Sequence, residues 1–192
     1  MLCPLWLWTA LSATADAKDI DASLTTRPLR AAGPAADLLY EHKASDTLGV
    51  YGRTTLGRDL PLPLRLVAAR AGAGGDGDQV YVYAAGVGVN RYFRGFDRGW
   101  YVGGDMEYAY RTYGLDRAHT DNDPGGRSQT LSAAPHLGYK IVGGRGFTVA
   151  SDVAVGYRVV FGREGHATRD VDEAPAGSGL GGGLSLRVGW SF

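Results

Sequence analysis

Large hydrophobic side chains alternate with small or polar ones along the last segment of the chain, residues 179–192. The large side chains occupy even positions: Leu180, Leu184, Leu186, Val188, Trp190 and Phe192. Glycine, serine and one arginine, Arg187, occupy the odd positions. A period of two residues predicts a β-strand with one apolar face and one polar face.

The same alternation recurs upstream. It is clearest over residues 100–111 and 147–161, and it is also present at 131–141, 81–93, 48–56 and 38–43. Residues 60–66 alternate as well, although Pro61 and Pro63 each remove a ladder hydrogen bond there. With the terminal segment these make eight strands. In an alternative assignment, residues 56–63 form a loop and a further strand lies before Ala35.

The spacers between these segments alternate in length. "FRGFDRG" and "VGGRG" contain tight turns, whereas "AGAGGDGD", "LDRAHTDNDPGGRS" and "GREGHATRDVDEAPAGS" are longer and polar. Short periplasmic turns, long external loops and an even strand count are typical of outer-membrane barrels. The pattern therefore predicts an all-β fold, a closed antiparallel up-and-down transmembrane β-barrel of eight strands, over residues 35–192, with both termini on the periplasmic side.

The N-terminal segment has a different pattern. An apolar run from Leu2 to Leu11 is followed by alanines at 13, 15 and 17, as in the apolar region and cleavage site of a secretory signal. We therefore expect a signal peptide over residues 1–17 and a polar periplasmic lead-in over residues 18–34. The alternative for residues 1–17 is an ordinary buried segment.

Composition narrows the functional classes. Lysine plus arginine and aspartate plus glutamate number 20 each, so no charge excess points to nucleic acid. The single cysteine, Cys3, excludes a disulfide framework, and the 30 glycines suit a curved, closed sheet. No apolar run reaches the length of a membrane-spanning helix.

Charged residues concentrate on the strand faces expected to point into the lumen. The predicted lumen set is Glu41, Arg53, Arg65, Asp105, Glu107, Arg111, Lys140, Asp152, Arg158 and Arg187. Buried charges of both signs should pair, so we expect a structural ion-pair network, with Asp105 or Glu107 contacting Arg111, Arg158 or Arg187. The aromatic residues expected to face the membrane are Tyr81, Tyr83, Trp100, Tyr108, Tyr110, Tyr139, Tyr157, Trp190 and Phe192.

Four stretches resemble a known group of proteins. "LLYEHKASDTLGVYGR", "NRYFRGFDRGWYVGGDMEYAY", "APHLGYKIVGGRGFTVASDVAVGYRV" and the terminal "LRVGWSF" are similar to small bacterial outer-membrane barrels of the DUF3575-like group, within the OmpA/OmpX-type barrel architecture. The resemblance covers residues 35–192, and the proline-rich residues 60–66 depart from it. It implies an outer-membrane location, and recognition of the C-terminal strand ending at Phe192 by the barrel-assembly machinery. It implies no chemistry.

Few residues suggest catalysis or metal binding. Ser132 and His136 share a strand face but lie about 13 Å apart at four residues' spacing, too far for direct proton transfer. The acidic loop residues Asp76, Asp78, Asp121 and Asp123 do not match a calcium-binding loop. We therefore expect no enzymatic activity, no metal and no cofactor.

Three functional classes remain. The favoured one is a monomeric integral protein of the bacterial outer membrane with a charged, largely plugged lumen and a structural or loop-mediated role, surrounded by lipid and lipopolysaccharide. The alternative is a porin-like narrow channel or carrier for small solutes. The third, a soluble lipocalin- or avidin-type barrel, requires an apolar lumen and a polar exterior, the reverse of the predicted charge placement.

Overall fold

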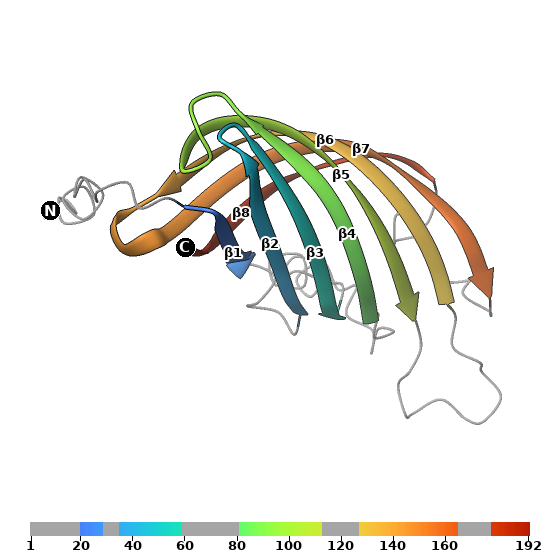
Figure 1. The fold of residues 1–192 in the computed structure, drawn as a ribbon. Coiled ribbons are helices and arrows are strands. Elements are labelled where there is room, and N and C mark those ends of the chain that lie inside the picture. Colours follow the sequence, from blue (N-terminus) through green and yellow to red (C-terminus); the bar gives the residue numbers. More distant parts are fainter. Residues whose placement is uncertain (1–19, 29–34, 59–80, 113–126, 165–177) are drawn as a thin grey trace, which may run out of the picture.

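The computed structural model describes residues 20–28, 35–58, 81–112, 127–164 and 178–192 and forms a closed antiparallel up-and-down barrel (Figure 1). The sheet order follows the sequence: β1 (Ala22–Thr26), β2 (Ala35–Ser45), β3 (Leu48–Arg58), β4 (Tyr81–Tyr92), β5 (Arg98–Thr112), β6 (Arg127–Val142), β7 (Phe147–Glu164) and β8 (Gly179–Ser191). The predicted all-β barrel of eight strands is confirmed. Among the described residues, no helix has the length and hydropathy needed to cross a bilayer.

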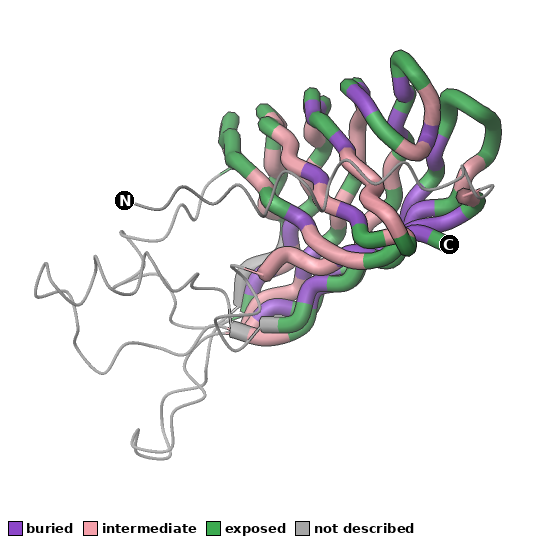
Figure 2. The backbone as a smooth tube through the Cα atoms, turned by 90° about the vertical axis from the view of Figure 1, so that its left-hand side faces the viewer, coloured by how far each residue is buried: buried purple, intermediate pink, exposed green. Residues whose placement is uncertain are grey.

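Side chains alternate between the two faces of the sheet, as the period of two requires. Buried and exposed positions therefore follow one another along the strands (Figure 2). In β4, for example, Val82, Ala84, Asn90 and Tyr92 are buried, whereas Tyr83, Val87 and Val89 are exposed. The large hydrophobic side chains lie mostly outside the barrel, whereas the buried charged side chains, Asp37, Glu41, Lys140 and Arg187, lie inside.

The two ends of the barrel differ. Three short connections lie at one end: residues 46–47, residues 93–97, and residues 143–146 with a single 3-10 turn, Gly144–Gly146. The strand ends Thr26, Ala35, Arg58, Tyr81, Thr112, Arg127, Glu164 and Gly179 lie at the other end. The C-terminus lies at the end with the short connections, which we call the short-turn end (Figure 1).

The first strand departs from the prediction. Residues 18–34 were expected to precede the barrel, yet β1 lies within them and pairs with both β2 and β8. The barrel therefore begins at Ala22 and not at residue 35, in line with the alternative of a strand before Ala35. Residues 60–66, predicted as a strand, lie outside the described residues, and β3 pairs directly with β4.

Closure of the barrel depends on a short contact between β1 and β8. Ser23, Leu24, Thr25 and Thr26 pair with Ser191, Trp190, Gly189 and Val188. Reciprocal backbone hydrogen bonds of 2.9 Å between Ala22 and Phe192 extend this contact. Pro28, which has no backbone N–H, follows two residues after β1 and cannot donate to a continued ladder.

Candidate functional site

The candidate site is the inner face of the barrel. Nine residues of the predicted lumen set lie on inner-face positions of the described strands: Glu41, Arg53, Asp105, Glu107, Arg111, Lys140, Asp152, Arg158 and Arg187. The tenth, Arg65, lies outside the described residues. Most of the nine fall into three networks of ion pairs and hydrogen bonds.

The first network surrounds Glu41 near the short-turn end. Its carboxylate lies 3.0 Å from Nζ of Lys140, and the two side chains are only 3% and 2% exposed. Asn90 Nδ2 and Tyr92 OH donate to the other carboxylate oxygen at 2.6 and 2.7 Å. Ser23 Oγ lies within 3.4 Å of both Glu41 and Lys140. This Glu41 network joins β1, β2, β4 and β6, so it ties together strands from opposite walls.

Aromatic rings cover the Glu41 network. Phe96, from the short connection after β4, is buried, with its ring centroid 5.4 Å from that of Tyr92. The Tyr101 ring also contacts Tyr92, with a centroid separation of 5.2 Å. The Lys140 ammonium stands 3.8 Å from the centroid of Phe96, a cation–π geometry. The ion pair is thereby shielded from water at this end of the lumen.

The second network centres on Arg187 of β8. Its Nη2 donates to Asp152 Oδ2 at 3.0 Å and to the hydroxyl of Tyr101 at 2.5 Å. The Tyr101 hydroxyl also lies 3.3 Å from Asp152 Oδ2. His136 lies beside the Tyr101 ring, and its Nε2 is 2.7 Å from Asn90 Oδ1. This Arg187 network is therefore connected to the Glu41 network through Asn90.

The third network lies farther from the short-turn end along β5. Arg53 of β3 contacts Asp105 at 3.2 Å and Glu107 at 2.5 Å, and all three side chains are largely buried. Arg53 and Glu107 are both the register partners of Gly86 in β4. Because Gly86 has no side chain, the guanidinium can cross β4 to reach the carboxylates. We call this the Arg53 network.

The observed partners differ from the predicted ones. Asp105 or Glu107 was expected to contact Arg111, Arg158 or Arg187, whereas the ion pairs of both are with Arg53, which was not among those three. Arg187 binds Asp152 of the adjacent strand instead. Arg111 donates to Thr130 Oγ1 at 2.9 Å. The residue types and the face were predictable, whereas the pairing follows from register and glycine placement.

Several contributors to the site were not in the predicted set. They are Ser23, Tyr51, Asn90, Tyr92, Phe96, Tyr101 and His136. Tyr51 and Tyr101 are register partners of Gly88 and Gly138, and a Cβ on either glycine would collide with the tyrosine ring. Both tyrosines occupy inward positions of the alternating pattern, and this could have identified them as lumen residues from the sequence. Their glycine partners were recognisable only once register was known.

His136 and Ser132 have different hydrogen-bond partners. His136 Nε2 has Asn90 as its partner, and Ser132 Oγ donates to the backbone carbonyl of Glu107 at 3.4 Å. Within the described ranges, no group of three or more His, Cys, Asp or Glu side chains is placed to hold a metal ion. The acidic loop residues Asp76, Asp78, Asp121 and Asp123 lie outside those ranges.

The outer face has an ordered pattern of its own. Seven of the nine predicted aromatics are exposed there: Tyr83, Trp100, Tyr108, Tyr139, Tyr157, Trp190 and Phe192. Tyr81 and Tyr110 have the same outward parity and are half-buried. Trp100, Tyr139, Phe147 and Trp190 lie near the short-turn end, with ring contacts Trp100–Tyr139 and Phe147–Trp190 at 5.2 and 5.6 Å.

A second group of outward aromatics lies toward the other end. Tyr108 and Phe161 have ring centroids 6.1 Å apart, and Tyr83 is the register partner of Tyr110. Between the two groups the outward side chains are mainly aliphatic: Val87, Val89, Val102, Met106, Leu137, Val153, Val155 and Leu184. We call these groups the two aromatic girdles and the aliphatic band.

Comparison with known proteins found no matching family model, no similar curated protein and no similar solved structure.

Proposed function

We propose that this protein is an integral barrel of a bacterial outer membrane whose lumen is plugged by the three networks, and that its role is structural or exercised through its long connections. The main support is the outer face. All eight strands expose large hydrophobic side chains there, and a patch of that extent on a soluble protein would drive association. Lipid contact makes the same surface favourable.

The spacing of the girdles supports this proposal. From Trp100 to Tyr110 is ten residues of β5, about 33 Å along a strand at 3.3 Å per residue. A strand tilted by about 40° then rises about 25 Å along the barrel axis, which matches the apolar band of outer-membrane barrels. β2 to β8 contain 11 to 18 residues, enough for the roughly 9–11 residues that a membrane-spanning strand requires.

The inner face favours a plug over a channel. An eight-stranded barrel has an interior just wide enough to be filled by side chains. Here the Glu41, Arg187 and Arg53 networks extend inward from β1 to β8, and the Tyr92, Phe96 and Tyr101 rings cover one end. The family resemblance noted above concerns the barrel and its outer-membrane location, not the plug. It remains part of the proposal, as do monomeric state, recognition by the assembly machinery and the absence of catalysis.

A charge on the aliphatic band tests the membrane assignment. We expect Val153→Arg, at a site 55% exposed in the middle of β7, to cost about 2–4 kcal/mol in phospholipid vesicles, since the guanidinium meets hydrocarbon. The free energy of unfolding, from urea titration with heat-modifiable migration on gels, measures this loss.

Leu48→Arg is the matched control. Leu48 also points outward but begins β3 at the short-turn end, where the expected cost falls to about 0–1 kcal/mol. If water surrounds the barrel, Val153→Arg should instead change stability by no more than about 0.5 kcal/mol. That outcome would exclude the membrane assignment.

Planar-bilayer recording distinguishes plug from channel. We expect the wild-type protein to show no steady conductance, because ion pairs and rings from every wall fill the lumen. A steady opening that Arg111→Ala abolishes would contradict the plug and establish the narrow channel instead.

A further inference from the structure

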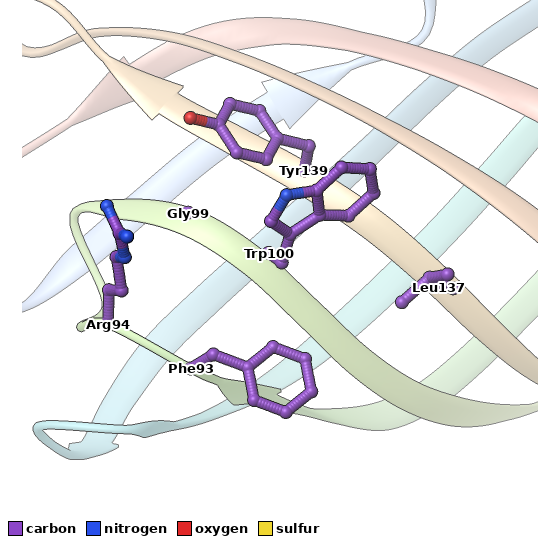
Figure 3. A pocket seen from close by; sticks show the side chains of 6 residues that line it. All are labelled: Phe93, Arg94, Gly99, Trp100, Leu137 and Tyr139. Carbon is purple, nitrogen blue, oxygen red and sulfur yellow. The ribbon is translucent and has the colours of Figure 1, made fainter.

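A groove on the outer surface crosses the girdle at the short-turn end. It encloses about 580 Å³ and is lined by Phe93, Arg94, Gly99, Trp100, Leu137 and Tyr139 (Figure 3). This volume is within the range of roughly 300–1,000 Å³ typical of small-molecule sites. The lining comes from β5, β6 and the connection after β4.

The walls of the groove are apolar and held by the fold. Phe93 N donates to the Trp100 carbonyl at 3.0 Å, which fixes the connection against β5. The Trp100 and Tyr139 rings meet edge to face at 5.2 Å. In Figure 3 Leu137 lies beyond these rings, away from the turn that carries Arg94. The groove therefore runs from the turn toward the aliphatic band.

One end of the groove is cationic. Arg94 is exposed, and the structure gives it no acidic partner among the described residues, whereas Arg98, the first residue of β5, pairs with Asp97 at 3.8 Å. Gly99 lies beside the Arg94 stem with a φ of 119°, a conformation that favours glycine. The floor next to Arg94 is thus backbone without a side chain.

We propose that this groove binds an anionic glycerophospholipid, with the phosphate on Arg94 and an acyl chain along Phe93, Trp100 and Leu137. A guanidinium binds phosphate through a geometry matched to two oxygens, and an aromatic girdle lies at the depth of lipid headgroups. The assignment rests on the proposed membrane location, because only a protein in a bilayer presents this groove to lipid.

Tryptophan quenching by brominated lipids tests the site. The full chain is reconstituted in phosphatidylcholine vesicles that contain a fixed fraction of acyl-brominated phosphatidylglycerol or acyl-brominated phosphatidylcholine. We expect brominated phosphatidylglycerol to associate with the wild-type protein about fivefold more strongly than brominated phosphatidylcholine does. This is the factor expected for one basic residue that interacts with an anionic lipid surface. Arg94→Gln should abolish this preference, and Arg94→Lys should retain part of it.

Arg145→Gln is the matched control, because Arg145 is exposed in another short connection at the same end and does not line the groove. The proposal would be overturned if wild type and Arg94→Gln showed the same preference for phosphatidylglycerol. It would also be overturned if Arg145→Gln lost as much of this preference as Arg94→Gln, because the preference would then come from general surface charge. Absence of quenching by either brominated lipid would overturn the membrane location itself. Heat-modifiable migration verifies that each variant is folded.

Discussion

Replacing Lys140 by methionine should destabilise the barrel by about 3–5 kcal/mol, the cost of leaving a buried charge without its counterion. Lys140 and Glu41 are each almost fully buried and lie 3.0 Å apart. The loss of stability should lie near the lower limit of this range, because Asn90 and Tyr92 still donate hydrogen bonds to Glu41. The measurement is the free energy of unfolding in urea with the protein in detergent micelles.

The double variant Glu41→Gln/Lys140→Met distinguishes this explanation from simple loss of packing. It removes both charges, so we expect it to recover most of the stability lost in Lys140→Met. Arg98→Gln provides an exposed comparison. Its pair with Asp97 has side chains 75% and 47% exposed, and such pairs contribute less than about 1 kcal/mol. A double variant as unstable as Lys140→Met would contradict a charge-based penalty.

The strand faces were predictable because side-chain direction is a local property. In a strand, successive side chains point to opposite faces whatever the partner strand is. Lys140 and Asp152 could therefore be assigned to the lumen from their neighbours alone. The same reasoning correctly placed Trp100 and Tyr108 on the outer face.

Pairing within the lumen was not predictable, because it depends on register between strands. Arg53 reaches Glu107 across Gly86, so the contact depends on the register of two strand pairs, β3 with β4 and β4 with β5. The local sequence pattern contains neither register. β1 entered the prediction only as an alternative, for a related reason. Its five residues, "ASLTT", include one large apolar side chain, Leu24, too few to establish a period. It is held by pairing with β2 and with β8, which lies at the other end of the chain.

That contact between the first and last strands is where a minimal substitution should have a disproportionate effect. A Cβ built on Gly189 would collide with the carbonyl oxygen of Leu24 and lie 2.7 Å from the Cα of Thr25. The obstacle is backbone, which cannot rotate away. We expect Gly189→Ala to cost about 3 kcal/mol, the upper range for an overpacked site, and to reduce the heat-modifiable folded fraction.

Gly183→Ala, six residues earlier in the same strand, should have the opposite sign. A Cβ there meets no atom within 4 Å, so the substitution mainly restricts the unfolded chain and should stabilise the barrel by about 0.4–1 kcal/mol. The two alanines add the same group to the same β-strand, and both positions have inward parity. If both destabilise equally, the close approach of β1 to β8 does not limit closure. Opposite signs would identify Gly189 as the position where the barrel is joined.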